Sequence, residues 1–161
     1  MRRPLDSFDR RILAELQAQG DIGPAELSER VHLSPSQCSR RLQRLKAEGY
    51  IDKIVALLSH DHLDLGVTAY VLVTLRSHAP EHSEAFQQRV RTSPEILECA
   101  STTGEADYVL KVCTKDLASY NVLLTEKLLR ASEIATARSS IVLNQLKSTT
   151  ELPLAFAAAE H

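Results

Sequence analysis

The chain has 161 residues, enough for one medium-sized domain or two small ones, and its net charge of −2 does not by itself indicate a nucleic-acid-binding protein. No apolar run approaches the ~20 residues of a membrane-spanning helix, and the N-terminal segment MRRPLDSFDRRI lacks the apolar centre of a secretory signal. Three cysteines without a Cys-x-x-Cys spacing argue against a disulfide framework or a cysteine-bound zinc site, so we expect a cytoplasmic protein with no membrane partner.

Helices are expected throughout the first 50 residues. The first should span residues 7–19, with Asp6 as its N-cap and with apolar residues at helical spacing that end before a glycine. A turn at 21–23 follows, and a proline then opens a short helix over 24–31. These two helices supply part of a small core and lead into a third.

The helix at 34–49 is the best marked in the sequence. Ser34 is a suitable N-cap, because its hydroxyl can accept from the free N–H groups of the first turn, and Gln37 completes a capping box. Pro35 occupies the first helical position, and Gly49 can adopt the left-handed conformation that ends a helix. One side of the helix is a narrow apolar stripe formed by Cys38, Leu42 and Leu45. The opposite side carries hydroxyls, amides and guanidiniums.

The polar face of this helix suits DNA, because its donors match phosphates and base edges in a major groove. A short helix, a tight turn and a longer capped basic helix form the helix-turn-helix pattern. Residues 1–54 hold ten Lys and Arg against eight Asp and Glu, whereas the remainder holds nine against thirteen. A basic helix taken alone is more often only a solvated surface, but the preceding helix and turn favour DNA binding. The expected DNA contacts are Ser34, Ser36, Gln37, Ser39, Arg40, Gln43 and Arg44, with the two arginines on guanine or phosphate.

The hydrophobic period changes after residue 49. We expect a strand at 50–59 and a polar connection at 60–66. The following elements should be strand 68–76, helix 80–91, strand 95–102, strand 106–114, helix 116–130 and strand 137–147. This β-α-β-β-α-β order predicts a ferredoxin-like fold with helices on one face of an antiparallel sheet. The other face should then pack against a second copy of the chain.

Two separate signatures give the chain a family resemblance. The segments LDSFDRRIL (5–13), AELSERVHLS (25–34) and RRLQRLKAEGYI (40–51) precede TTGEADYVLKV (102–112) and SSIVLNQLK (139–147), and together they resemble the Lrp/AsnC family of bacterial and archaeal transcription regulators. The resemblance implies an α+β chain with a winged helix-turn-helix at 1–52, a linker strand and connection at 53–66, and a ferredoxin-like (RAM-type) domain for effector binding and oligomerisation at 67–161. It also implies a regulator rather than an enzyme, which binds a double-stranded DNA operator as a homodimer, tetramer or octamer. No cofactor is implied beyond a small effector, commonly an amino acid.

The loop TTGEADY (102–108) is the candidate effector site. Gly104 permits close backbone approach, nearby N–H groups can hold a carboxylate, and Asp107 or Glu105 can accept from an ammonium group. A plain β-turn with surface acids explains the same residues, and both interpretations remain open at this point. The resemblance favours an effector site and adds positions beside it, so the expected set is Ser101, Thr103, Gly104, Glu105, Asp107, Leu117, Ser139 and Ser140.

Two positions depart from the family pattern. His32 stands where a glycine is often found in the turn before the basic helix, and a left-handed backbone is less comfortable for a residue with a side chain. The final strand often begins with two alternating threonines, which here are Ala137 and Ser139, so one hydroxyl is missing from any effector contact carried over from relatives.

A metal-responsive DNA-binding regulator is the alternative function. His60 and His62 lie two residues apart, and His78 and His82 stand four apart, a spacing at which two imidazoles can share a metal. Surface histidines without a metal explain the pattern better, because His78 precedes a proline and so should lie outside the helix. An enzyme is not favoured, since the sequence has no nucleophile-elbow, phosphate-loop or zinc-protease motif.

Overall fold

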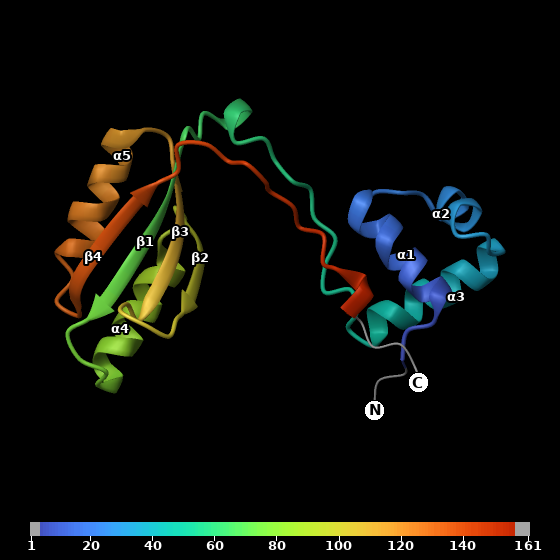
Figure 1. Ribbon diagram of the computed structural model, residues 1–161, viewed down its shortest axis with the longest axis horizontal. Helices are drawn as coiled ribbons and strands as arrows, with labels where there is room; N and C mark the ends of the chain where they lie inside the picture. Colours follow the sequence, from blue (N-terminus) through green and yellow to red (C-terminus); the bar gives the residue numbers. More distant parts are fainter. Residues whose placement is uncertain (1–3, 157–161) are drawn as a thin grey trace. The chain divides into compact units, whose positions relative to one another are not determined.

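The computed structural model describes residues 4–156 (Figure 1). Its chain divides into two compact units, the first formed by Met1–Leu57 together with Lys147–His161 and the second by Leu58–Leu146. The first three residues of the expected N-terminal domain and the last five of the expected C-terminal domain lie outside the described residues. Within residues 4–156, no helix combines the length and the apolar character needed to cross a membrane.

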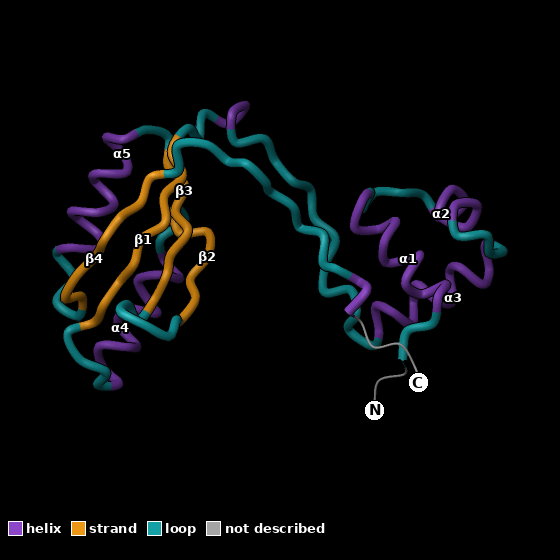
Figure 2. The backbone as a smooth tube through the Cα atoms, viewed as in Figure 1, coloured by secondary structure: helices purple, strands orange, loops and turns teal. Residues whose placement is uncertain are grey.

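The first unit is built on α1 (Ser7–Ala18), α2 (Pro24–Arg30) and α3 (Pro35–Ala47), drawn in purple in Figure 2. These are the helices that the sequence predicts. Their inward side chains form one buried cluster, consisting of Leu5, Ile12, Leu13, Ile22, Leu27, Val31, Cys38 and Leu45. The apolar stripe of α3 packs into this cluster, so the opposite face of α3 is exposed to solvent.

Both long helices begin at their predicted caps. The Asp6 carboxylate accepts from the Asp9 N–H at 2.9 Å, and the Asp9 carboxylate accepts in return from the Asp6 N–H at 3.1 Å. At α3 the Ser34 hydroxyl accepts from the Gln37 N–H at 3.3 Å, and the Gln37 amide oxygen accepts from the Ser34 N–H at 3.4 Å. These reciprocal bonds satisfy donors that a helix start would otherwise leave unpaired.

The turns on either side of α3 use left-handed backbone. His32, between α2 and α3, has a φ of +56°, so this turn adopts the conformation that a glycine would take with less strain. Gly49 has a φ of +73° and ends α3, as its position predicts.

The second unit contains β1 (Val67–Leu75), α4 (Pro80–Thr92), β2 (Ile96–Ser101), β3 (Tyr108–Thr114), α5 (Leu117–Val122), a π-helix over Leu123–Leu129 that continues α5, and β4 (Ile134–Ile141). All its strand pairs are antiparallel, and the strand order is β2-β3-β1-β4. This is the predicted β-α-β-β-α-β arrangement.

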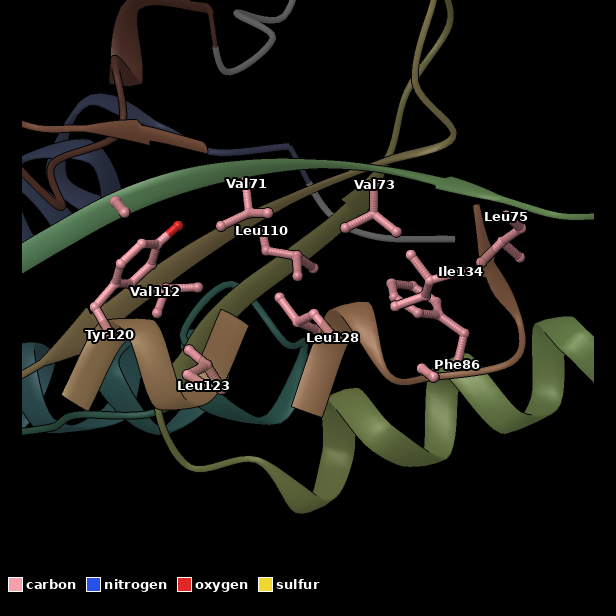
Figure 3. Close-up of a cluster of buried hydrophobic side chains, with 12 residues drawn as sticks. Val71, Val73, Leu75, Phe86, Leu110, Val112, Tyr120, Leu123, Leu128 and Ile134 are labelled. Carbon is pink, nitrogen blue, oxygen red and sulfur yellow. The ribbon is translucent and has the colours of Figure 1, made fainter. Parts of the chain in front are cut away.

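Alternate residues of the central strands point toward the helices and form the core of this unit. Figure 3 shows Val71 and Val73 of β1 with Leu110 of β3 on one side, and Phe86 of α4 among the helical residues that meet them. The intervening residues of β1 face the other way, and the largest of them, Tyr70 and Leu72, are 41% and 44% exposed. One face of the sheet is therefore left uncovered by the other residues of this unit.

The predicted strand at 50–59 is wrong. Residues 51–59 of the described chain form no strand, and the connection after them contains only a short 3-10 turn, Asp61–Leu63. A β-branched sequence favours extended backbone, but a strand also needs a neighbour to take its N–H and C=O groups. The sheet of residues 4–156 does not extend to this segment.

The predicted final strand at 137–147 is displaced, because β4 spans Ile134–Ile141. The central strand sets these limits, since Leu75 pairs with Ile134 at one end and Ala69 pairs with Ile141 at the other. The compact unit that contains the sheet ends at Leu146, whereas the expected domain runs on to residue 161. Residues 147–156 instead group with the helical unit.

Candidate functional site

The outer face of α3 carries most of the side chains that the sequence assigns to DNA. The exposed residues are Ser34, Ser36, Gln37, Ser39, Arg40 and Gln43. The Ser34 hydroxyl lies 3.2 Å from the Ser36 hydroxyl and also serves the helix cap, so part of its hydrogen-bonding capacity is already used. Arg40 makes no ion pair with any residue in 4–156, and its guanidinium is therefore available to a ligand.

Arg44, which the sequence groups with the DNA contacts, does not lie on this exposed face. Its guanidinium forms an ion pair with Asp9 of α1, and its side chain is 22% exposed. Arg41 is bound on the same side, at 2.6 Å from Asp6 and 2.8 Å from Asp9, and it lies over the Phe8 ring. Residues 41 and 44 are three apart on the helix and flank the apolar stripe, so helical geometry turns both toward α1.

The ion pairs change the proton affinity of their members. Burial alone would raise the pKa of Asp6, but the Asp9 N–H and the Arg41 guanidinium hold this pKa below its ordinary value. The hydrogen bond to Asp6 in turn raises the pKa of Arg41. The basic residues of α3 are therefore of two kinds, Arg41 and Arg44 paired on the inner side and Arg40 and Lys46 exposed.

The exposed face of α3 has the size and chemistry to read a DNA groove. A helix of 13 residues is about 20 Å long, and its diameter of about 10–12 Å fits the roughly 12 Å width of a major groove. A guanidinium such as that of Arg40 can donate twice to guanine, and an amide such as that of Gln43 can donate to and accept from adenine.

The loop between β2 and β3 is closed by its own hydrogen bonds. The Thr102 N–H donates to the Asp107 carbonyl at 2.9 Å, and the Thr102 hydroxyl donates to the Ala106 carbonyl at 2.8 Å. Gly104 has a φ of +128°, which residues with a side chain rarely adopt. The residues Thr103, Gly104 and Glu105 at the tip are exposed.

Asp107 forms hydrogen bonds through both its carboxylate and its backbone. One of its carboxylate oxygens accepts from the Leu75 N–H at 2.7 Å, and the other lies 3.6 Å from Nε2 of His78. Its own N–H donates to the Val73 carbonyl at 3.0 Å. Asp107 thus ties the loop to the end of β1, with one carboxylate oxygen accepting from the backbone.

A hollow lies beside the loop on the uncovered face of the sheet. Its volume is about 390 Å³, and it is lined by Leu72, Thr74, Glu105, Ala106, Thr136 and Arg138. The Arg138 guanidinium is 3.7 Å from the Glu105 carboxylate, and both side chains are more than three-quarters exposed. The hollow therefore places a cation, an anion and an apolar side chain within reach of one small molecule.

Sequence reasoning missed Arg138 and Thr136 because it misplaced the last strand. In the observed register Arg138 lies opposite Leu72, so it shares the uncovered face. Ser139 points the other way, and its hydroxyl accepts from the Tyr120 hydroxyl among the helices. The alternation of positions 136, 138 and 140 is the signal that identifies the outward residues once the strand limits are known.

The remaining effector candidates do not line the hollow. Ser140 pairs with Tyr70, whereas Arg138 pairs with Leu72. Ser140 therefore lies further from the loop than Arg138 does. Ser101 is exposed at the end of β2, and Leu117 is 59% exposed at the start of α5. Of the eight expected residues, all within the described chain, Glu105 alone lines the hollow.

A second cavity of about 370 Å³ lies beside α4. Its lining consists of Ala85, Gln88, Arg89, Thr92, Ser93 and Lys127. Its two cations already have carboxylate partners, since Arg89 lies 2.8 Å from Glu133 and Lys127 lies 2.7 Å from Glu95. Burial alone would raise the pKa values of Glu95 and Glu133, but these partners hold them below their ordinary values. The cavity consequently offers no surplus charge to a ligand.

Three of the four histidines of the metal alternative lie beside a hydroxyl or a thiol. His60 Nδ1 lies 3.8 Å from Cys113 Sγ, and His62 Nδ1 lies 2.8 Å from the Ser59 hydroxyl. His82 Nδ1 is 2.7 Å from the Ser77 hydroxyl. Within residues 4–156, no group of three or more His, Cys, Asp or Glu side chains is placed to hold a metal ion.

Comparison with known proteins matches most of the chain to two domain families. Residues 5–52 match the winged helix-turn-helix DNA-binding family, and residues 68–152 match the Lrp/AsnC ligand binding domain. The leucine-responsive regulatory protein of Escherichia coli K12 is 39% identical over 150 residues, which cover 93% of this chain and 92% of the relative.

Two solved structures are similar over nearly their whole length. A transcriptional regulator of Neisseria meningitidis, in complex with L-Met, superposes with a TM-score of 0.91 at 41% identity, covering 93% of this chain and 97% of the other. An AsnC family transcriptional regulator of Agrobacterium tumefaciens superposes with a TM-score of 0.90 at 34% identity, covering 96% of this chain and the whole of the other.

Proposed function

Because this chain belongs to the Lrp/AsnC family of DNA-binding transcriptional regulators, we propose that the exposed face of α3 reads its operator. The exposed guanidinium of Arg40, which has no ion-pair partner in residues 4–156, carries this proposal. Ser36, Ser39 and Gln43 lie exposed around it and supply the hydroxyl and amide groups that fix register on the duplex. Such a regulator acts in the cytoplasm, where its operator lies.

The operator should have two half-sites, because the uncovered face of the sheet suits a second copy of the chain. Tyr70 and Leu72 together expose apolar surface at the centre of this face, and an isologous contact between two copies buries it. Two α3 helices in a symmetric dimer enter major grooves one helical turn, about 34 Å, apart. Tetramers or octamers follow if further surfaces of the dimer associate.

The effector is a free amino acid bound in the hollow beside the loop. The Arg138 guanidinium binds the carboxylate, the Glu105 carboxylate binds the ammonium group, and Leu72 contacts an apolar side chain. L-methionine is the first candidate, since the Neisseria meningitidis relative is a complex with L-Met. A second copy on the uncovered face closes the hollow over the ligand, so binding and assembly are linked.

The DNA proposal is tested on an operator obtained by selection from random duplexes. Arg40→Ala should weaken operator binding by about 1–3 kcal/mol, or roughly 5- to 150-fold in Kd, if Arg40 is bidentate to guanine. Arg91→Ala, which removes an exposed arginine from α4, is the control and should bind like the wild type. Equal affinities for wild type and Arg40→Ala would remove α3 from the DNA interface.

The assembly and the effector need separate variants. Tyr70→Glu places a charge on the uncovered face away from the hollow and should give monomers in sedimentation velocity. For the effector, a thermal-shift screen of the twenty amino acids comes first, because a ligand at 100 times its Kd adds about 2.7 kcal/mol to stability. Arg138→Ala should abolish the largest shift, while Arg76→Ala, another exposed arginine of this unit, should retain it. A shift that survives Arg138→Ala places the effector elsewhere.

A further inference from the structure

Asp9 of α1 carries a fully buried carboxylate and is not one of the proposed DNA contacts. Its side chain is 0% exposed. One oxygen accepts from Arg41 Nη1 at 2.8 Å, and the other accepts from Arg44 Nη2 and from the Asp6 N–H. The Asp9 carboxylate therefore completes the capping box of α1 and also binds two arginines of α3.

These arginines depend on Asp9 for their position. Arg44 has no other ion-pair partner among the described residues, and its Nε is buried without a hydrogen bond there. Arg41 shares its guanidinium between Asp9 and Asp6, and the ring of Phe8 lies beneath it at 5.4 Å. Both arginine side chains are 22% exposed, so they lie at the edge of the unit and reach solvent when released.

The ion pairs remove half of the basic charge of α3 from the surface that faces DNA. The helix has four basic residues, and Arg40 and Lys46 are the two left exposed. Phosphate contacts add affinity for any duplex without regard to sequence, and each steepens the dependence of log K on log salt by about 0.9. Two free arginines on α3 would therefore strengthen binding to every sequence more than they would improve recognition of the operator.

We infer that Asp9 is a specificity-determining positioning residue, which holds Arg41 and Arg44 against α1 and so withholds two cations from non-operator DNA. This inference rests on the proposed role of α3 in DNA binding. Asp9 itself does not touch DNA in this arrangement; it acts through the two arginines.

The test compares binding to random-sequence and operator duplexes over a range of salt concentrations, using the full chain. Asp9→Asn removes the charge that holds Arg44 and leaves Arg41 paired with Asp6 alone. The salt slope for random duplex should therefore steepen by about 0.9 to 1.8 per protomer, which is about 0.9 for each arginine released. Affinity for random duplex should rise several-fold at low salt, and the ratio of operator to random affinity should fall. Asp21→Asn is the matched control, because it removes the same charge from an exposed turn of the same unit.

A second pair of variants keeps the inference falsifiable if Asp9→Asn does not fold. Asp6→Asn retains a good helix cap and releases Arg41 from one of its two carboxylates. The slope for random duplex should therefore steepen by about 0.45 per protomer, which is half the value for a fully released arginine. Arg41→Gln should leave the wild-type slope unchanged, because Arg41 is held away from phosphate. A slope that falls by about 0.9 in Arg41→Gln would show that this arginine already contacts DNA, and the inference would be overturned.

The two proposals fail in distinguishable ways. If wild-type protein has no operator preference, the role of α3 is wrong, but the slopes on random duplex still report whether Asp9 restrains the arginines. If wild type prefers its operator and Asp9→Asn matches Asp21→Asn in slope and in affinity ratio, Asp9 is only structural.

Discussion

The C-terminal segment provides the first prediction, because its last described residues pack on the helical unit. Leu154 contacts the buried cluster of α1, α2 and α3. The side-chain amide of Gln17 binds the backbone of Leu152 at both ends, donating to its carbonyl at 3.2 Å and accepting from its N–H at 2.6 Å. We predict that Leu154→Ala and Gln17→Ala each destabilise the helical unit and leave the sheet unit unaffected.

The contacts set the size of the effect. Leu154→Ala removes three carbon atoms from a half-buried side chain, and at about 0.8 kcal/mol for each fully buried group the loss is about 1 kcal/mol. Gln17→Ala removes two exposed hydrogen bonds, each worth about 0.5 kcal/mol at the lower end of the usual range, for a loss of about 1 kcal/mol. For a unit of this size, 1 kcal/mol lowers the Tm by about 4–8 °C.

Hydrogen exchange followed by mass spectrometry measures the two units separately, which suits a chain without tryptophan. Amides of α1 and α3 should lose protection in both variants, while amides of β1 and β3 should keep it. Leu143→Ala is the control, since Leu143 lies in the same stretch after β4 and is 97% exposed. Equal loss of protection in β1, or an effect of Leu143→Ala as large as that of Leu154→Ala, would refute the assignment of this segment to the helical unit.

Three further predictions concern the sheet unit and the cysteines. Phe86→Ala should lower the free energy of unfolding by about 3–5 kcal/mol, seen as lost exchange protection in β1, because this ring is fully buried. The pKa of Glu133 lies below its ordinary value, so its pair with Arg89 contributes stability above that ordinary pKa and the contribution is lost as pH falls through the lower, folded-state pKa. Acid titration by circular dichroism should accordingly give a shallower loss of structure in Glu133→Gln than in wild type. Iodoacetamide should label Cys99, which is exposed to solvent, before Cys38, which is buried. Partial desolvation raises the pKa of both thiols and slows their reaction at neutral pH, so the difference in solvent access sets the order. Equal labelling of the two cysteines in the native state would contradict the observed burial.

The sequence by itself determined the elements whose stabilising bonds are local. Asp6 and Ser34 cap helices through partners only three residues away. The caps, the helix limits and the outward face of α3 can therefore be predicted from the local sequence. The same holds for the alternation of β1 and for the strand and helix order of the second unit. These features identify the fold and the exposed Arg40 without knowledge of any distant contact.

Only the tertiary structure decided which distant groups meet. Periodicity places Arg44 beside the apolar stripe of α3, but its partner Asp9 lies 35 residues away, so nothing local distinguishes a DNA-facing arginine from a paired one. The limits of β4 come from its pairing with β1, and that register brings Arg138 to Glu105 in the hollow. The segment at 51–59 has the composition of a strand and forms none in the described chain, because a strand is defined by a neighbour's hydrogen bonds and not by its own side chains.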